Sequence, residues 1–481
     1  MDLAQMIEAA TWEFKQKLSA HCENLDQESL TPQLAEQVTS GLQEALKACG
    51  IAALRTFLES YEVDEAPQQI ESVLYRFKQP SEKIFLTPFG KMRLSRNLFQ
   101  ADEGGPSYVP LDAMWGMVGE FATVEVREAV LFSVTLITPE ETVDVLKKTA
   151  LFAPSATAIK HIVEETGAWL EEMDETLNQS IRQEEEIPEG TKVMVASLDG
   201  TNLRLKEPGK KRGRPQERPG EKPSEKSPTS FKQALVGSIS LYGAAPKEGT
   251  PPERLVSRYV AQMPEEGGHT LKIRFEEELD HIEGQLKEKE EVKKVFLCDG
   301  ARGLWKYGDT TPRFIGYEKL VDFYHTTEHL SEAAELLFGK KSAQAQSWYK
   351  TYYHKLLTQD GAAETLIRSI DYYKSRRRLG QKRLKAIQGE RTFFFRNKHR
   401  MAYADFRRKG LPIGSGPVEA ACKTLVKTRL CRSGMQWAWQ GGQRILQLRT
   451  YVKSKRWDAF WNQYKQARYA NEQLLDYADA A

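Results

Sequence analysis

Two short apolar runs, each followed by Asp–Gly, constrain the fold of this chain more than any other feature. Residues 193–198 read VMVASL before Asp199–Gly200, and residues 295–298 read VFLC before Asp299–Gly300. Runs of this length predict buried strands. Asp–Gly is also common turn chemistry, so one such run would indicate little. Two of them predict neighbouring strands whose ends bring two carboxylates together.

The residues around these runs predict the rest of a sheet. Three further elements are expected: a hairpin partner over 201–205, a strand over 234–242 and a charged helix over 275–291. Three strands, a helix and a further strand outline a ribonuclease-H-like mixed sheet, which is an α/β fold. The chain has 481 residues, enough for about three domains. All-α parts are therefore expected beside the sheet.

The domain boundaries follow changes in composition and pattern. A catalytic domain is expected over residues 191–317 and 411–465. Residues 206–230, rich in Pro, Gly, Lys and Glu, predict a flexible basic insertion within it. Residues 318–410 predict a basic helical insertion, and residues 466–481 a C-terminal tail.

The residues before 190 predict helices and one short strand. Over residues 1–80, apolar side chains recur every three or four positions among acids, which predicts an acidic helical region for packing or oligomerisation. A strand is expected at Lys83–Pro88. Two helices, Thr138–Leu151 and Ser155–Leu170, follow, and the first opens with a capping-box pattern.

The helix pair Thr138–Leu151 and Ser155–Leu170 has two interpretations. A helix pair joined by a three- or four-residue turn is typical of a helix-turn-helix, so residues 81–190 form a candidate DNA-binding region. Lys160 and His161 would then stand near the start of the helix that reads DNA. The other interpretation is an ordinary helical packing unit.

Charge is distributed unevenly along the chain. The net charge of +2 comes from 69 basic and 67 acidic side chains. Residues 1–80 carry 6 bases against 13 acids, a net of −7, whereas residues 374–409 carry 14 bases against 2 acids, a net of +12. Residues 204–226 carry 9 bases against 4 acids, a net of +5. Clustered positive charge indicates a phosphate-backbone partner, although such runs also form solvated helix faces.

A third carboxylate is expected at Glu419. It follows the Gly–Ser–Gly–Pro turn of residues 414–417, in the first turn of a helix. The helix dipole alone favours an acid there, but it does not explain the turn. Three carboxylates suit two Mg²⁺ ions, because hard cations prefer carboxylate oxygens and can stabilise both reacting oxygens of a phosphodiester.

Several other classes of protein are excluded. The five cysteines are scattered and form no Cys-x-x-Cys pair, so neither a disulfide framework nor a zinc ribbon is supported, and a reducing cytoplasm is expected. No run of 18 apolar residues exists, so no membrane partner is expected. The first ten residues lack the pattern of a signal peptide.

With these residues in place, the chain resembles the DDE-type transposases of bacterial insertion sequences, most closely the ISKra type. The resemblance covers residues 83–465 and rests most strongly on IGSGPVEAACK at residues 413–423. It rests also on three shorter blocks: SLDG at 197–200, FLCDGA at 296–301 and VDFYH at 321–325. The resemblance implies that Asp199, Asp299 and Glu419 are the metal-binding catalytic triad, and that a helical insertion separates the last two.

The resemblance extends to an Asp-x-x-His element and to one departure. Asp322 and His325 match the element, in which His325 would orient a phosphate near the metals with its tautomer set by Asp322. A helix-capping Asp with a structural His is the alternative. Many relatives carry paired cysteines just before a Pro–Leu–Asp segment, but residues 98–105 hold no cysteine here, so no zinc is expected.

Five basic residues are further candidates for DNA contacts. Arg212 and Arg214 lie in an Arg–Gly–Arg–Pro sequence similar to an AT-hook, which enters the minor groove; a nonspecific phosphate contact is the alternative. Lys423, Lys427 and Arg429 follow Glu419 on its helix and would contact phosphates beside the metals.

These inferences predict a DNA transposase. It would bind double-stranded DNA at the ends of its element, cleave with Mg²⁺ or substituting Mn²⁺, and join the strand to target DNA. Because two ends of the element must be joined, a homo-oligomer is expected. The protein would be cytoplasmic and would associate with the nucleoid when bound to DNA. Two alternatives remain: a ribonuclease-H-like nuclease that does not join strands, and a non-catalytic DNA-binding relative of transposases.

Overall fold

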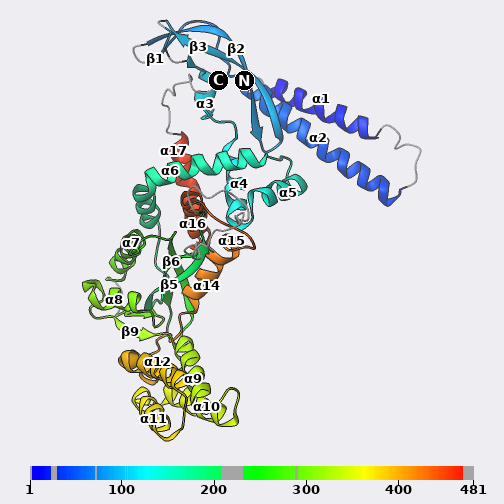
Figure 1. Cartoon of the computed structure of the whole chain (residues 1–481). Coiled ribbons are helices and arrows are strands. Elements are labelled where there is room, and N and C mark those ends of the chain that lie inside the picture. Colours follow the sequence, from blue (N-terminus) through cyan, green and yellow to red (C-terminus); the bar gives the residue numbers. More distant parts are fainter. Residues whose placement is uncertain are drawn as a thin grey trace, which may run out of the picture. The chain divides into compact units, whose positions relative to one another are not determined.

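The computed structural model describes residues 3–22, 30–70, 73–102, 104–105, 107–206, 231–287 and 291–469. The chain divides into two compact units (Figure 1). Unit 1 comprises residues 1–181 and 457–481, and unit 2 comprises residues 182–456. Among the described residues, no helix has the length and apolar character that crossing a membrane requires.

Unit 1 opens with two long helices and then an antiparallel sheet. The elements are α1 (Leu3–Cys22), α2 (Pro32–Glu59), β1 (Gln68–Ile70), β2 (Val73–Thr87), β3 (Gly90–Ala101) and β4 (Ser107–Tyr108), with the strands in the order β1-β2-β3-β4. The helical expectation for residues 1–80 is therefore wrong beyond Glu59. The expected short strand is part of a hairpin in which Thr87 pairs with Gly90. Gly90 has φ +122°, which suits glycine.

The hairpin packs on α2 because its inward residues are apolar. Phe85, Met92 and Leu94 are fully buried and form a small core with Leu58 and Leu111. Alternate residues point to opposite faces of a strand, so Met92 and Leu94 share the inner face.

The rest of unit 1 is helical. Its elements are α3 (Pro110–Met114), α4 (Val124–Leu136), α5 (Pro139–Thr149), α6 (Ala156–Gln183, whose last two residues fall in unit 2) and α17 (Trp457–Tyr469). The capping box predicted at Thr138 is confirmed: Thr138 and Glu141 exchange side-chain to backbone hydrogen bonds of 2.8 and 3.2 Å. Helix α17 packs in unit 1 through Trp169–Tyr464 and Phe132–Trp457 ring contacts of 5.0 and 5.2 Å. The catalytic domain was expected to end at residue 465, but unit 2 ends at residue 456, nine residues earlier in the sequence.

Unit 2 is built on a five-stranded mixed sheet. Its strands are β5 (Val193–Arg204), β6 (Phe231–Tyr242), β7 (Arg254–Gln262), β8 (Lys293–Cys298) and β9 (Glu318–Val321), in the order β7-β6-β5-β8-β9. The β5–β6 and β6–β7 pairs are antiparallel, and β5–β8 and β8–β9 are parallel. Residues 201–204 do not form a hairpin partner; they continue β5, and Arg204 pairs with Phe231. The basic insertion at 207–230 lies outside the described residues.

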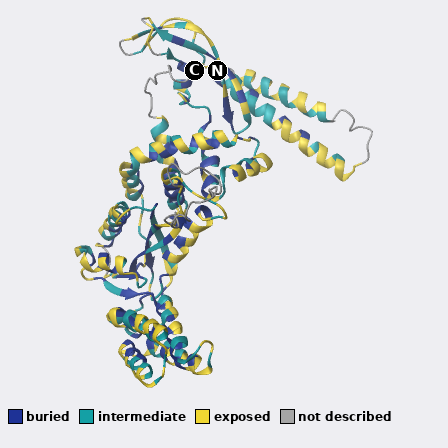
Figure 2. Ribbon diagram, in the orientation of Figure 1, coloured by how far each residue is buried: buried dark blue, intermediate teal, exposed yellow. Residues whose placement is uncertain are grey.

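Three helical elements accompany this sheet, namely α7 (His269–Leu286), α8 (Arg302–Thr310) and the 3₁₀ turn η2 (Pro312–Phe314). Helix α7 buries Phe275, Leu279 and Ile282 against the strands. Figure 2 shows the buried residues of unit 2 concentrated along the strands of its sheet.

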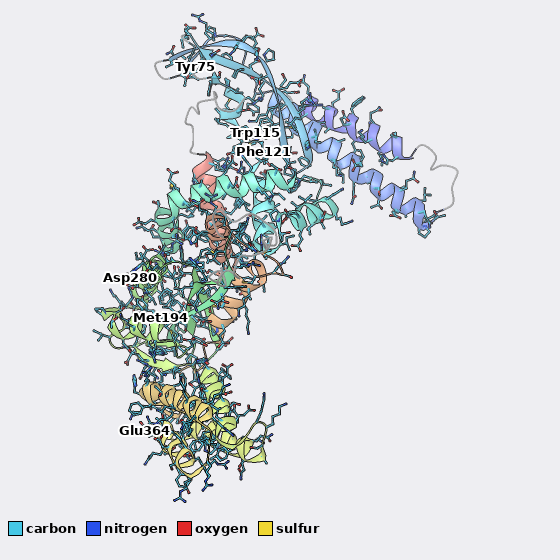
Figure 3. The ribbon with its side chains drawn as sticks, in the orientation of Figure 1. Tyr75, Trp115, Phe121, Met194, Asp280 and Glu364 are labelled. Atoms are coloured by element: carbon cyan, nitrogen blue, oxygen red, sulfur yellow. The ribbon has the colours of Figure 1, made fainter. Side chains whose placement is uncertain are left out.

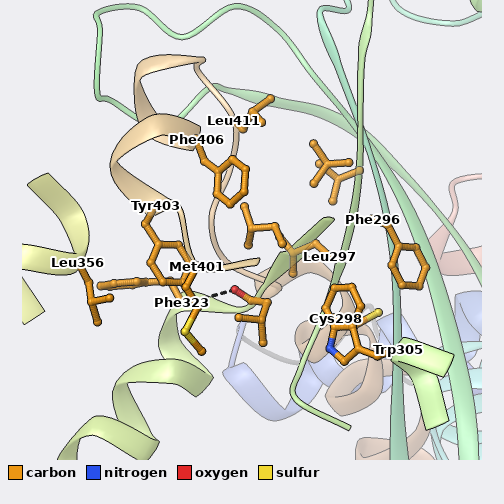
Figure 4. Packing of buried hydrophobic residues seen from close by; sticks show 14 of the residues in the cluster. Phe296, Leu297, Cys298, Trp305, Phe323, Leu356, Met401, Tyr403, Phe406 and Leu411 are labelled. Carbon is orange, nitrogen blue, oxygen red and sulfur yellow. Dashed lines mark hydrogen bonds between the residues drawn. The ribbon is translucent and has the colours of Figure 1, made fainter. Parts of the chain in front are cut away.

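A helical insertion follows β9. It comprises α9 (Phe323–Phe338), α10 (Ala343–Thr358), α11 (Ala362–Arg376), α12 (Gln381–Asn397), η3 (Lys398–Arg400) and α13 (Tyr403–Arg408). The expected start at 318 is wrong because residues 318–321 pair with β8. Tyr403 ties the insertion to the sheet (Figure 4), because its hydroxyl donates to the Val321 carbonyl of β9 at 2.9 Å. Within the insertion, its ring lies 5.0 Å from that of Phe323.

The chain returns to the sheet after the insertion. The closing elements are α14 (Gly416–Ala421), a π-helical turn η4 (Cys422–Lys427), α15 (Thr428–Leu430) and α16 (Trp439–Lys453). Trp437 then bonds to Arg204 and Lys206 through its backbone, which holds the end of β5 against this segment. Single π-helical turns within helices occur frequently at functional sites.

Candidate active site

Asp199 and Asp299 occupy equivalent positions on two parallel strands. Leu198 and Cys298 form the last pair of the β5–β8 ladder, and the next residue on each strand is the aspartate. Asp299 stands just beyond the end of β8, as expected. Asp199 stands within β5 rather than at its end, because β5 continues against β6.

The start of α8 holds Asp299. Its Oδ1 accepts a hydrogen bond from the Ala301 backbone N–H at 2.8 Å. Its carbonyl accepts from Trp305 Nε1 at 2.5 Å. The Arg400 guanidinium covers the Trp305 ring, with its carbon 3.9 Å from the ring centroid. The aspartate is thereby positioned by both the helix and the insertion.

Glu419 is held by the turn that precedes α14. The Ser415 hydroxyl donates to Glu419 Oε1 at 2.9 Å. The Ser415 N–H donates to Asp322 Oδ2 at 2.5 Å. The Phe323 N–H donates to the Ile413 carbonyl at 3.0 Å. The strand end at Asp322 therefore anchors the turn that carries the third carboxylate.

The charges of the other two predicted acids act on Asp199. Burial raises the pKa of Asp199, and the charges of Asp299 and Glu419 raise it further. The Gly200 N–H, 2.6 Å from Asp199 Oδ1, and the Cys422 thiol donate hydrogen bonds that oppose this rise. Both other acids therefore lie near enough to Asp199 for their charges to act on it.

The donor set suits a hard divalent cation. Among the residues that the structure describes, no group of three or more His, Cys, Asp or Glu is arranged so that it could hold a metal ion. The chemistry of Asp199, Asp299 and Glu419 nevertheless fits Mg²⁺, which prefers carboxylate oxygens and keeps several waters. Its charge would favour the ionised form of Asp199, whose pKa is raised first by burial and then by the other two acids.

Asp322 has a different role from the one predicted. It is fully buried and caps α9, with Oδ1 accepting from the His325 backbone N–H at 2.5 Å. Asp322 was predicted to set the tautomer of His325 through the ring, but it contacts the backbone N–H of His325. The ring Nδ1 of His325 lies 3.5 Å from Glu328 Oε2 instead. The capping alternative is the one that the geometry favours.

His325 belongs to an aromatic cluster of the insertion. Its ring lies 4.8 Å from that of His329 and 5.8 Å from that of Phe393. His329 stacks on Phe393 at 3.6 Å and its Nδ1 lies 2.7 Å from Glu390. These contacts connect His325 to α12, whose Phe393 ring also lies against Gly300, the residue after Asp299.

The predicted DNA contacts fall into three groups. Lys423 and Lys427 are exposed, as a phosphate contact requires. Arg429 is 1% exposed and its guanidinium lies over the Trp437 ring at 5.1 Å, so its prediction as a surface contact is wrong. Arg212 and Arg214 lie outside the described residues.

The predicted helix-turn-helix fits the structure less well than the sequence indicated. Lys160 and His161 are exposed in the second turn of α6, and His161 Nδ1 lies 3.3 Å from Glu165. Six residues, 150–155, separate α5 from α6, rather than the three or four expected. Helix α6 also carries six acids against Lys160 and Arg182.

Three residues near the acids were missed at the level of sequence. Ser415 links Asp322 to Glu419, Cys422 bonds to Asp199, and Trp305 bonds to the Asp299 backbone. Only Cys422 had a usable signal, since it lies three residues after Glu419 and shares its helical face. The other two act through tertiary contacts.

No family model matches this chain, and a search of curated proteins finds no match. Its function is therefore inferred from residues and geometry.

Proposed function

We propose that this protein is a DDE-type DNA transposase with a ribonuclease-H-like catalytic domain. The observation that carries the proposal is the placement of Asp199 and Asp299 at equivalent positions on two parallel strands, with the charge of Glu419 acting on Asp199 from a distant helix. The strand order β7-β6-β5-β8-β9 supports the fold, because three antiparallel strands are followed by two parallel ones.

The three acids would hold two Mg²⁺ ions, or Mn²⁺ in their place, which supply Lewis-acid stabilisation of the attacking and leaving oxygens of a phosphodiester. The protein's own groups position the acids. Ser415 orients Glu419, and the Ala301 N–H orients Asp299. The Cys422 thiol orients Asp199 by donating to it. Catalysis is then positioning and electrostatics.

The substrate would be double-stranded DNA. Lys423 and Lys427 are exposed shortly after Glu419 and can contact phosphates near the reacting bond. Residues 81–190 would contribute further DNA binding. Two element ends must be joined to target DNA, so the active form would be a homo-oligomer.

A strand-transfer assay tests the proposal. The full chain is incubated with a labelled duplex of the element end, a target plasmid and Mg²⁺ or Mn²⁺. We expect joined products, and we expect Asp299→Asn to lower their yield by about a hundredfold or more. Asp280→Asn is the matched control, because Asp280 is an exposed carboxylate on α7 (Figure 3).

The other outcomes point to the two alternatives. Cleavage without joining would indicate a nuclease. DNA binding without cleavage, unchanged in Asp299→Asn, would indicate a non-catalytic DNA-binding protein and would reject the role given to the three acids.

A further inference from the structure

A basic cleft lies beside Asp299. It opens between α8 and α12 and has a volume of about 580 Å³, within the range of pockets that hold ligands. Gly300, the residue after Asp299, lines it. A methyl group at Gly300 would collide with the Phe393 ring, so the two walls of the cleft approach closely there.

The walls carry an excess of positive charge. Arg302 and Lys306 line the cleft from α8, and Arg396 and Arg400 from the other side. Its one lining acid, Asp309, is already paired with Arg400 at 2.5 Å and with Lys319 at 3.1 Å. Within the described part of the chain, Arg302, Lys306 and Arg396 make no ion pair and are exposed.

A second cleft, which acids line as well as bases, offers a comparison. It has a volume of about 390 Å³ and is lined by Lys293, Arg408 and Lys409, among others. There Arg408 pairs with Asp360 at 2.8 Å, and Lys409 with Glu318 at 2.6 Å. Lys293 donates to the Lys409 carbonyl at 2.7 Å. Lys293, Arg408 and Lys409 are therefore bound within the fold, whereas Arg302, Lys306 and Arg396 beside Asp299 make no ion pair among the described residues.

The cleft suits a sugar–phosphate backbone better than a base. Its two aromatic residues are already covered: Arg400 lies on Trp305, and His329 stacks on Phe393. What remains is a set of guanidinium and ammonium donors, which bind phosphate oxygens. The N-terminus of the nine-residue helix α8 adds positive potential at the same place.

We infer that this cleft binds consecutive phosphates of one DNA strand and leads that strand to Asp299. The assignment of the ligand as DNA rests on the proposed function. Arg302, Lys306 and Arg396 contact the phosphates, and Arg400 holds the wall through Asp309 and Trp305.

The test measures binding of a labelled single strand of DNA to the full chain, in EDTA and over a series of salt concentrations. The triple variant Arg302→Ala, Lys306→Ala, Arg396→Ala should bind about tenfold or more weakly, and the magnitude of its salt slope should fall by about 2, because each phosphate contact on a single strand contributes about 0.7. Thermal unfolding of each variant shows that it is folded.

The matched control removes three other exposed cations of unit 2, with Lys340→Ala, Lys350→Ala and Arg378→Ala. It should retain most of the affinity and slope. An equal loss in both triple variants would overturn the inference, since binding would then follow net charge alone. Wild-type protein that does not bind the strand would also overturn it, and so would full displacement of the strand by inorganic phosphate at constant ionic strength.

Failure of this inference is distinguishable from failure of the proposed function. Binding in EDTA requires no catalysis, so a selective loss in the first triple variant supports the cleft even if no joined product forms. Strand transfer by a wild-type protein whose affinity is unchanged in that variant would support the function and overturn the cleft.

Discussion

The backbone N–H of Ser415 donates to the carboxylate of Asp322 at 2.5 Å, across 93 residues of sequence. Asp322 follows the last strand of the sheet, and Ser415 precedes the helix of Glu419. The whole helical insertion lies between them, so this bond closes its base. The Ser415 hydroxyl extends the same connection to Glu419.

Removing the Asp322 carboxylate should destabilise the fold at that closure. Asp322→Ala leaves the buried Ser415 N–H and the cap of α9 without their acceptor. We expect a loss of about 2–4 kcal/mol in the free energy of unfolding, measured by urea denaturation. Ser342→Ala removes only the half-buried cap of α10 and should cost about 1 kcal/mol. Equal losses would contradict the role given to Asp322.

The Cys422 thiol should matter for DNA cleavage through Asp199. Cys422→Ala removes the donor to that carboxylate, and we expect cleavage to slow by about tenfold. Cys422→Ser retains a donor and should keep most of the rate. Cys431→Ala changes an exposed cysteine and serves as the control. A serine variant as slow as the alanine variant would show that packing, not the hydrogen bond, is required.

A buried ion pair should make the stability of unit 2 sensitive to acid. Burial would raise the pKa of Glu278, but the Arg456 and Arg182 guanidiniums outweigh it and hold the pKa below 4.5. Arg456 Nη2 lies 2.5 Å from Glu278 Oε1. The folded-state pKa is thus below the unfolded one, so the stabilisation is present above pH 4.5 and is lost as the pH falls through the folded value.

The variant Glu278→Gln tests this account. At neutral pH we expect it to lose about 2 kcal/mol of unfolding free energy, because Arg456 then keeps only its pair with the half-buried Glu185. Its stability should then decline less steeply than that of the wild type below pH 4.5. The adjacent Glu277→Gln removes a pair with Arg182 at a half-exposed carboxylate and should cost less than about 1 kcal/mol. Parallel pH profiles for wild type and Glu278→Gln would rule the pair out as the cause.

The neighbouring cations Lys427 and Arg429 should separate DNA binding from stability. Lys427→Ala removes an exposed charge and should weaken DNA binding several-fold, while unfolding free energy changes by less than about 0.5 kcal/mol. Arg429→Ala removes a buried side chain packed on Trp437 and should cost about 3 kcal/mol of stability. Fluorescence anisotropy and urea denaturation measure the two effects, and the reverse assignment would contradict the observed burial.

Much of the sheet of unit 2 was predictable because its signal is local. The runs before Asp199 and Asp299 are short and apolar, and the structure pairs them as parallel strands in register. Residues 201–204 were wrongly predicted to turn back as a hairpin partner, whereas they continue β5. The sequence pattern of a strand that continues is the same as that of a strand that turns back, and the residues that pair with 201–204 begin only at Phe231. Part of β2 was predicted at residues 83–88, but its partner β3 was missed, because the buried face that begins with Met92 and Leu94 continues with the charged Arg96 and so loses its apolar alternation.

The sequence by itself determined which residues could serve as a carboxylate site, since residue type, apolar runs and the Gly–Ser–Gly–Pro turn are local properties of Asp199, Asp299 and Glu419. Tertiary structure alone decided what surrounds them. Contacts between distant segments place Cys422 beside Asp199, bond Asp322 to Ser415 and bury Arg429. A short stretch of sequence does not determine such hydrogen bonds or such burial. The cleft beside Asp299 arises in the same way, because α8 and α12 supply its cations from positions at least 90 residues apart (396 − 306 = 90).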